Sequence, residues 1–170
     1  EEEKMKHHVL FLIPDPFCTH ICCLMDQVTS ATGIPPPYRN LPPHIAVLRP
    51  IPDIDESILK NLVKSVVLRM KQTKITLDGL SHFEKQHIVL PIQSTRSAAS
   101  LWVDIDNLLS RLPEYEYGED DARNSLHVTV ATKTSHVFDT AWPEIRKIEV
   151  TPMTFSLEKV ALYRKPVVGG

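Results

Sequence analysis

The sequence has little that is typical of a secreted, membrane-bound or disulfide-stabilised protein. Its three cysteines, Cys18, Cys22 and Cys23, fall within one short segment, and an odd, clustered set is a poor disulfide framework. This usage is typical of a reducing compartment, so we expect a cytoplasmic protein. The apolar runs are far shorter than the roughly 20 residues of a membrane-spanning helix, which predicts no membrane partner. The acidic residues 1–3 have the wrong charge for a signal peptide.

An excess of charge of either sign is also missing, since 19 Lys and Arg residues are balanced by 21 Asp and Glu residues. A net charge near −2 gives no long-range attraction for a nucleic acid, so any phosphate must be bound locally. Hydrophobic residues make up 42% of the 170 positions, which is enough for a real core. We expect residues 1–170 to form a single monomeric domain with two small lobes around one cleft.

A four-residue pattern occurs twice, at residues 44–47 and at residues 127–130. Each copy is a histidine, an apolar residue, a small residue and an apolar residue, with the alternation of a β-strand. Side chains two apart in a strand point to one face, so His127 shares a face with Thr129, and His44 with Ala46. The two histidines are 83 residues apart, about half the chain. We therefore expect two similar halves that each supply one histidine to a shared cleft.

The remaining patterns predict an α+β protein with mostly antiparallel strands. Strands are predicted at 8–13, 44–48, 74–80, 87–92, 125–131, 147–150 and 153–163, with a turn at 81–86 and a loose tail from Lys165. Helices are predicted from Pro16 to near Gly33, from Asp53 or Asp55 to Met70, from residues 94–97 to Leu112 and, less regularly, across 137–147. Asp15 is predicted to cap the first helix.

Two histidines that face each other form an acid and base pair, because an imidazole with a pKa of about 6.5 exists in both protonation states near neutral pH. One takes a proton from water while the other donates a proton to the leaving oxygen of a phosphate ester. The Thr129 hydroxyl is placed to bind a non-bridging phosphate oxygen. A zinc site is the alternative, but Asp104, Asp106 and His136 are unconnected as further ligands. We expect no metal and no cofactor.

These motifs resemble those of the two-histidine (2H) phosphoesterase superfamily, and within it the 2′-5′ RNA ligase-like proteins, also called RNA 2′,3′-cyclic phosphodiesterases. Residues 41–44, residues 75–80 followed by Phe83, and residues 155–163 also resemble segments of that family. The resemblance covers nearly the whole chain. It implies a bilobal fold, in which two antiparallel-sheet lobes with pseudo-twofold symmetry surround a central cleft. It also implies metal-independent hydrolysis of cyclic phosphates on RNA ends or nucleotides, with 2′-5′ ligation as the reverse reaction.

Carried over by position, the resemblance makes His44 and His127 the catalytic pair and Thr129 a phosphate ligand. We assign activation of water to His127 and protonation of the leaving group to His44. One departure from the family pattern is Ala46, which stands where the first motif has threonine or serine. The missing hydrogen bond to an anion is worth about 1.5–3 kcal/mol, or roughly one to two powers of ten in rate.

Five further residues are candidates for the substrate pocket. Tyr38 and Arg39 precede the first motif and are able to stack on a base or pair with a phosphate. Phe83 is a candidate platform for a base. Arg49 and Lys133 are basic residues that follow the first and second motifs. Either Arg49 or Tyr38 is a candidate to replace the phosphate contact that Ala46 lacks.

Three functions remain open on these grounds. The first is a phosphodiesterase acting on the 2′,3′-cyclic phosphate ends of RNA. The second is a phosphodiesterase acting on small 2′-5′-linked or cyclic oligonucleotides or on ADP-ribose cyclic phosphates. The third is a nucleotide-binding or RNA-binding module with weakened catalysis, which Ala46 keeps open. The balanced charge favours a small substrate or an RNA end over a long duplex.

Overall fold

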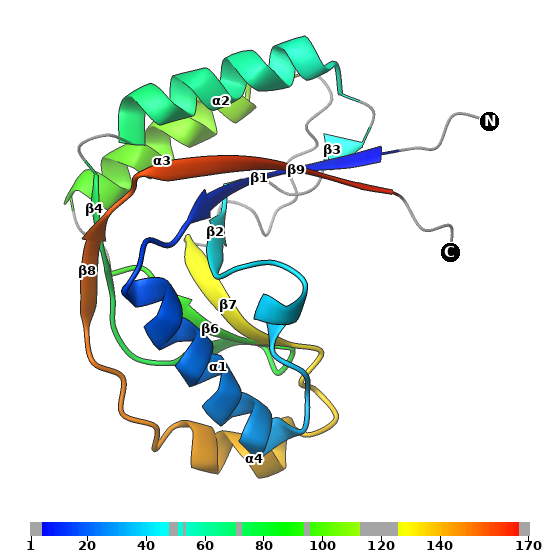
Figure 1. The fold of residues 1–170 in the computed structure, drawn as a ribbon, viewed down its shortest axis with the longest axis vertical. Helices are drawn as coiled ribbons and strands as arrows, with labels where there is room; N and C mark the ends of the chain where they lie inside the picture. The colour runs from blue at the N-terminus through cyan, green and yellow to red at the C-terminus, as the bar shows by residue number, and fades with distance from the viewer. Residues whose placement is uncertain are drawn as a thin grey trace.

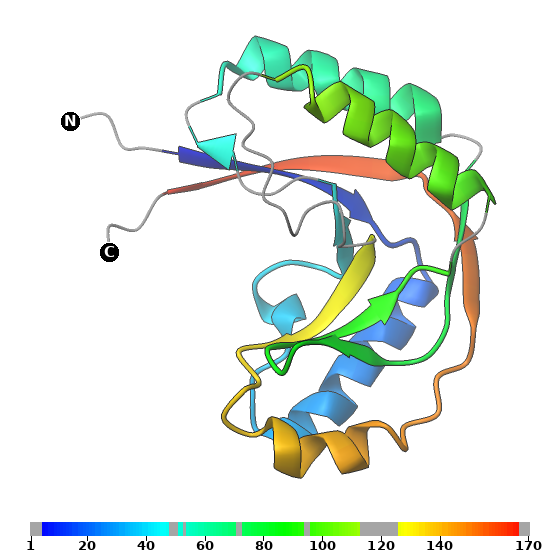
Figure 2. The same ribbon diagram turned by 180° about the vertical axis from the view of Figure 1, so that it is seen from behind.

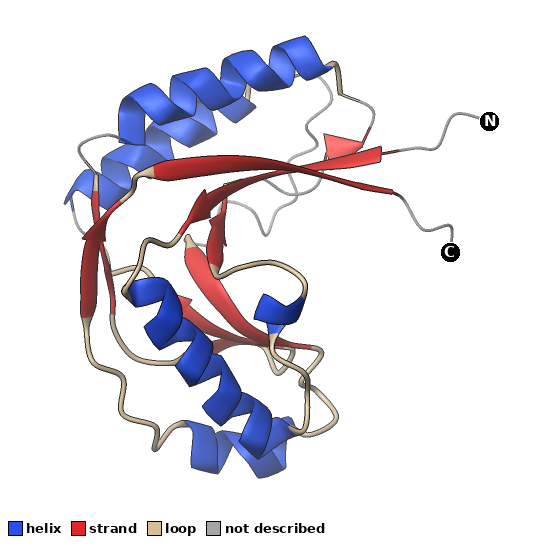
Figure 3. Cartoon of the chain, in the orientation of Figure 1, coloured by secondary structure: helices blue, strands red, loops and turns tan. Residues whose placement is uncertain are grey.

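The computed structural model of the protein describes residues 5–47, 51–52, 54–70, 73–93, 96–112 and 126–166. In chain order the elements are β1 (Met5–Leu12), α1 (Phe17–Thr32), the 3₁₀ turn η1 (Pro37–Arg39), β2 (His44–Ala46), β3 (Ile51–Pro52), α2 (Glu56–Met70), β4 (Lys74–Leu77), β5 (Ser81–Phe83), β6 (His87–Pro91), α3 (Arg96–Leu109), β7 (His127–Thr132), α4 (Phe138–Ile145), β8 (Met153–Ser156) and β9 (Lys159–Pro166). Figure 3 shows how these helices and strands alternate along the chain. None of the described helices is long and apolar enough to span a bilayer.

Seven strands form one sheet that runs through both halves of the chain. Their order is β3-β1-β2-β7-β6-β5, and β9 pairs with the other edge of β1. β4 and β8 form a separate two-stranded sheet. Figure 1 shows β1 and β9 as a long ribbon beneath α2 and α3, while β6 and β7 lie behind α1. Every pairing between the described strands is antiparallel, which confirms the predicted α+β class.

The two halves have the same order of elements and exchange their last strands. The first half runs β1, α1, β2, α2, β4, β5, and the second runs β6, α3, β7, α4, β8, β9. β5 pairs with β6 of the second half, β9 pairs with β1 of the first half, and β4 pairs with β8. This arrangement is the pseudo-twofold relation that the repeated motif predicted.

A continuous hydrophobic core packs one face of the large sheet against the helices. Alternation buries Val9 and Phe11 of β1, Ile45 of β2 and Val128 of β7, each of which is 0% exposed. These side chains form one cluster with the apolar faces of α1, α2 and α3. The motif histidines point to the opposite face of the sheet and are half-buried. In Figure 2 α1 lies behind β6 and β7, so that this opposite face is turned toward the viewer.

The ends of α1 follow from two residues beyond its apolar stripe. Gly33 adopts a left-handed conformation with φ of 74°, and its N–H donates to the Thr29 carbonyl at 2.8 Å. This confirms the predicted end of the helix. The predicted start is wrong by one residue, because the helix begins at Phe17 with Pro16 before it. Asp15 does not cap the helix backbone; its carboxylate accepts a hydrogen bond of 3.1 Å from the Thr19 hydroxyl.

The start of α2 is set by a side-chain cap. The Asp55 carboxylate accepts a hydrogen bond of 2.7 Å from the Ser57 backbone N–H, which otherwise has no partner in the first turn of the helix. Of the two residues predicted to cap this helix, Asp55 therefore does so. Asp53 lies outside the described residues.

Two strand predictions are wrong because the partners lie far away in the sequence. The predicted hairpin between residues 74–80 and 87–92 does not form; residues 81–83, predicted as part of a turn, form β5 and pair with β6. Residues 147–150 are not a strand, since the N–H groups of Lys147 and Ile148 bond back to Glu144 and Ile145 and prolong the last turn of α4. The predicted strand 153–163 divides into β8 and β9, and β9 continues to Pro166 because β1 pairs with it throughout.

Candidate active site

The pairing of β2 with β7 brings the two repeated motifs together. Ile45 lies opposite Val128 in the antiparallel register. Residues opposite each other in such a pair point to the same face, so the same register puts His44 beside Thr129 and Ala46 beside His127. We call the face that carries these four residues the histidine face.

The strands on either side extend the histidine face with apolar residues. β1 places Leu12 beside His44 and Leu10 beside Ala46. On the other side, β6 places Pro91 beside His127 and Val89 beside Thr129. Two proton-transfer groups and one hydroxyl are thus surrounded by apolar neighbours, and such surroundings strengthen their interaction with an anion.

His44 is oriented by the loop that precedes it. Its Nδ1 lies 2.8 Å from the carbonyl oxygen of Pro42. Because a carbonyl oxygen only accepts hydrogen bonds, Nδ1 carries a proton in this arrangement. The Nε2 atom is therefore the nitrogen of His44 that is placed to exchange a proton with a bound molecule.

His127 lies against an aromatic ring supplied by β5. The rings of Phe83 and His127 meet edge to face, with centroids 4.8 Å apart and an interplanar angle of 81°. This contact brings Phe83, a residue predicted to lie in a turn, onto the histidine face. The ring restricts the orientation of the imidazole and adds apolar surface beside it.

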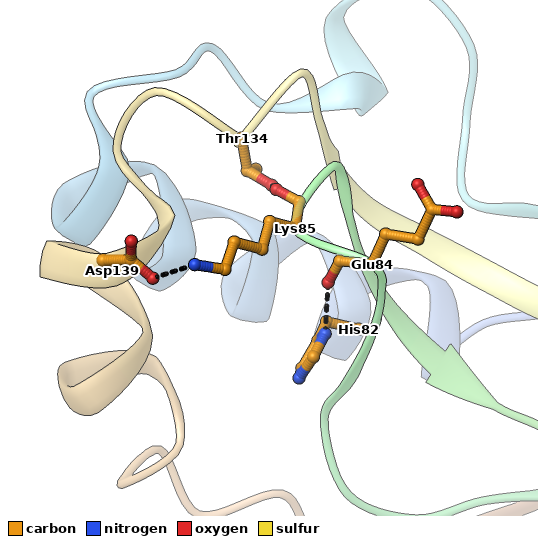
Figure 4. A network of polar contacts seen from close by, with 5 residues as sticks. All are labelled: His82, Glu84, Lys85, Thr134 and Asp139. Carbon is orange, nitrogen blue, oxygen red and sulfur yellow. Dashed lines mark hydrogen bonds and ion pairs between the residues drawn. The ribbon is translucent and has the colours of Figure 1, made fainter.

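The turn between β5 and β6 is fixed to the loop after β7 and to α4, as Figure 4 shows. The Thr134 hydroxyl donates a hydrogen bond of 2.6 Å to the Lys85 carbonyl, and the Lys85 ammonium lies 2.7 Å from the Asp139 carboxylate. Nδ1 of His82 donates to the Glu84 carbonyl. These contacts hold β5 in position, and with it the ring that touches the second motif.

The other pocket candidates are placed less favourably. The Tyr38 hydroxyl donates a hydrogen bond of 2.7 Å to the Asp26 carboxylate of α1, and this bond raises the pKa of Tyr38. Tyr38 is thus drawn toward the helices, on the side opposite the histidine face. Arg39 is exposed in η1, and Lys133 is exposed directly after β7 with φ of 57°. Arg49 lies outside the described residues.

One residue on the histidine face was given no role by the sequence. His8 points to this face because it alternates with Leu10 and Leu12, and its cross-strand neighbour is Tyr163. Burial, followed by the charges of Lys165 and His44, lowers the pKa of His8 below its ordinary value. The alternation of residues 8–13 contains this signal, but it becomes readable only once β1 is known to pair with β2.

A hollow of about 360 Å³ lies at the His44 end of the histidine face, lined in part by Leu12, Pro42 and Lys159. A second hollow, of about 420 Å³, lies between α1 and residues 149–153 and contains neither motif. Among the described residues, no group of three or more His, Cys, Asp or Glu side chains is placed to hold a metal ion. Asp104, an earlier candidate ligand, instead faces Arg69 at 3.7 Å.

Comparison with known proteins relates the chain to one family and one fold. Residues 13–167 match the 2′-5′ RNA ligase superfamily. The structure of Escherichia coli LigT complexed with 3′-AMP is similar with a TM-score of 0.60 at 14% sequence identity, covering 99% of this chain and 92% of that one. Kluyveromyces marxianus Usb1 gives a TM-score of 0.55 at 12% identity, covering 98% of this chain and 99% of that one. A crystal structure of a phosphoesterase gives 0.58 at 14% identity, covering 94% and 88%.

No curated protein matches the chain. At 12–14% identity the likeness to LigT and Usb1 shows a shared fold, which is the bilobal α+β fold expected from the sequence. The family match covers most of the chain, including both strands that carry the repeated histidine motif. The chain belongs to the 2′-5′ RNA ligase superfamily of two-histidine phosphoesterases.

Proposed function

We propose that the protein is a metal-independent phosphodiesterase that hydrolyses the 2′,3′-cyclic phosphate ends of RNA or of nucleotides. The observation that carries this proposal is the register of β2 and β7, which puts His44, His127 and Thr129 on one face as immediate neighbours. An acid, a base and a hydroxyl donor are the groups that hydrolysis of a phosphodiester requires. The membership of the chain in a phosphoesterase family supports the same reaction class.

In the proposed reaction, His127 takes a proton from water as the water oxygen attacks phosphorus. The bond between phosphorus and the 3′-oxygen breaks, and Nε2 of His44 donates a proton to that oxygen, leaving a 2′-phosphate. The Pro42 carbonyl accepts from Nδ1 of His44 throughout, so proton transfer is confined to Nε2. Thr129 donates a hydrogen bond to a non-bridging oxygen, on which negative charge increases in the transition state.

Ligands bound by structural relatives support a nucleotide substrate. LigT has been solved in complex with 3′-AMP, and Usb1 in complex with uridine monophosphate. Phe83 adds an aromatic ring next to His127, where the base or ribose of a nucleotide has room to stack. We therefore place the nucleoside on the Phe83 side of the phosphate.

The test is hydrolysis of a nucleoside 2′,3′-cyclic phosphate with and without EDTA. We expect turnover to persist in EDTA and to fall by about 10²–10⁴-fold in His44→Ala and in His127→Ala. His136→Ala is the matched control, because His136 is exposed and lies after β7, outside the motif. Loss of activity in EDTA, or retention of activity in either motif variant, contradicts the proposal.

Ala46 favours a second candidate function, a nucleotide-binding module with weakened catalysis. Its side chain is exposed beside His127, where the family pattern places a hydroxyl. Calorimetry with 2′-AMP and 3′-AMP separates the two functions, since tight binding without turnover of any cyclic phosphate supports the binding module. Small 2′-5′-linked and cyclic oligonucleotides belong in the same substrate panel, because the same acid and base pair would cleave them.

A further inference from the structure

The ribbon formed by β1 and β9 continues the histidine face away from the motifs and toward both ends of the chain. We propose that this ribbon binds the RNA strand that leads to the reacting phosphate, so that the preferred substrate is a polyribonucleotide end. This inference rests on the proposed function for the identity of the reacting group. Binding of the strand is nevertheless measurable without any turnover.

The register of the sheet determines which side chains the ribbon contributes. Leu12 and Leu10 lie beside His44 and Ala46, so His8 and Lys6, which alternate with them, point to the same face. β9 adds the residues paired with these positions, which are Lys159, Ala161, Tyr163 and Lys165. In Figure 2 the ribbon runs away from β2 and β7 toward the chain ends, with α2 on its other side.

Successive rows of this face change in character along the ribbon. The row that contains His127 continues through Ala46 and Leu10 to Ala161, and is therefore low and apolar. The next row holds the two rings of His8 and Tyr163, which are cross-strand neighbours and half-buried. Rows of one face are about 7 Å apart, because the rise is 3.2–3.4 Å per residue. The rings thus begin roughly one row beyond the reacting group.

Two lysines follow the rings. Lys6 and Lys165 face each other across the ribbon in the following row, and both are exposed. Neither forms an ion pair with any residue in the described part of the chain. By contrast, Arg164 on the opposite face of β9 is bridged to Glu56 of α2 at 2.8 Å. The ribbon therefore has neutralised charge on its helix side and free positive charge on its histidine face.

The positive character of this row is local to the ribbon. β1 and β9 contain no Asp or Glu residue, although the whole chain has a net charge of −2. The charges of Lys165, His44 and Lys6 all lower the pKa of His8, after the larger effect of burial, so these cations gather around that imidazole. A polyanion that meets the histidine face is attracted here and not over the rest of the surface.

A single strand of RNA matches the order of these rows. Its terminal phosphate lies at the two motif histidines, a base stacks on the rings of His8 and Tyr163, and an upstream phosphate reaches Lys6 and Lys165. A mononucleotide has no second phosphodiester to offer this last row. The apolar floor at Ala46 and Ala161 leaves room for the strand to cross between the two sites.

The test compares binding and turnover of two ligands by one pair of variants. The probes are a trinucleotide that ends in a 2′-phosphate, for fluorescence anisotropy, and cyclic-phosphate substrates of one and three nucleotides, for kinetics. We expect Lys6→Ala/Lys165→Ala to weaken trinucleotide binding by about tenfold or more. The slope of log affinity against log salt should decrease by about 1.4, because each lost phosphate contact on a single strand contributes about 0.7.

The same lysine variant should lower the ratio of kcat/KM for the trinucleotide to that for the mononucleotide. Lys64→Ala/Arg146→Ala is the control of equal charge loss, since both residues are exposed and lie on α2 and after α4, away from the histidine face. Tyr163→Ala should also weaken trinucleotide binding about tenfold, and Tyr163→Phe should restore it, because stacking needs the ring and not the hydroxyl.

The outcomes separate the ribbon from the catalytic proposal. If the trinucleotide binds with the lysine-dependent salt slope but no cyclic phosphate is cleaved, the ribbon inference is supported and the proposed function fails. If the mononucleotide is cleaved by the histidine pair while the lysine and control variants bind the trinucleotide equally well, the ribbon inference is overturned. A wild-type enzyme that binds the trinucleotide no better than 2′-AMP also overturns it.

Discussion

Ala46 is the residue at which the two halves of the site differ most. The register puts Thr129 beside His44, and the equivalent position beside His127 is occupied by a methyl group. A phosphate held between the two histidines therefore has a hydroxyl donor on one side only. Since Ala46 is exposed, a slightly larger side chain there meets no packed neighbour from the core face.

We expect Ala46→Thr to raise kcat/KM for a cyclic phosphate by about one to two powers of ten, because it adds one hydrogen bond to an anion. Ala46→Val, which has the same shape without the hydroxyl, is the matched control and should give no gain. The measurement is the steady-state kinetics of both variants. Equal activities of the threonine and valine variants would show that the hydroxyl has no place in this site.

For single residues, the sequence indicates faces but not neighbours. Alternation alone predicts that His127 and Thr129 share a face, because that relation is local to one strand. It does not predict that His44 lies beside Thr129, because the register between β2 and β7 depends on the packing of both halves. Tyr38 shows the converse error, since its position before the first motif gave no sign of the hydrogen bond to Asp26.

At the level of elements, α2 offers a direct test of its cap. Hydrogen bonds from Ser57, through its side chain and its backbone N–H, lower the pKa of Asp55. A carboxylate with a lowered pKa in the folded state stabilises the fold above its unfolded pKa and loses that effect as pH falls through the folded pKa. The cap should therefore be fully effective at neutral pH and lost in strong acid.

We expect Asp55→Ala to lower the Tm at pH 7 by about 2–4 °C, and Asp55→Asn to retain most of the wild-type Tm, because asparagine also caps helices. The difference between wild type and Asp55→Ala should shrink as the pH is lowered below about 3.8. Thermal unfolding followed by circular dichroism at several pH values measures both effects. A difference that is constant down to pH 2 would argue against the charge of Asp55 as the cause.

Elements with local end signals are the ones that the sequence predicts well. Gly33 ends α1 through a backbone conformation that glycine adopts without strain, and this was readable from the sequence. β5 was not readable, because Ser81–Phe83 is a short segment that becomes a strand only through pairing with β6 and through the contacts of Lys85 and Thr134. Three residues carry too little pattern to identify a strand without its partner.

For the whole molecule, His8 links the histidine face to global stability. Its pKa is lowered chiefly by burial, and then by Lys165, His44, Lys6 and His7. Below the unfolded pKa of about 6.5 the unfolded chain binds a proton at this site that the folded chain binds less readily. The free energy of unfolding therefore decreases as pH falls through and below this value, and is not reduced by this group at higher pH.

We expect the free energy of unfolding of the wild type to decline more steeply between pH 7 and pH 5 than that of His8→Gln, which cannot take up the proton. His136→Gln is the control, since His136 is exposed and lies outside the ribbon. Urea unfolding across this pH range measures the difference. Parallel curves for wild type and His8→Gln would show that His8 is equally protonated in both states.

The fold class was predictable because the repeated motif and the alternating segments are features of short windows. The antiparallel α+β class and the relation between the halves follow from them, and both agree with the structure. The pairing of β4 with β8 and of β9 with β1 joins segments at opposite ends of the sequence, and no short window contains that information. For the same reason the role of His8 became visible only in three dimensions.

The exchange of last strands between the halves has a consequence for how the protein folds. β1 must find β9, so the pairing that completes the long ribbon waits until nearly the whole chain has been made. A fragment that stops after β6 would expose an edge of β1, and the complementary fragment would carry β9 without its partner. We therefore regard the chain as one cooperative unit despite its internal duplication, in which the two fragments should associate with each other more readily than either folds alone.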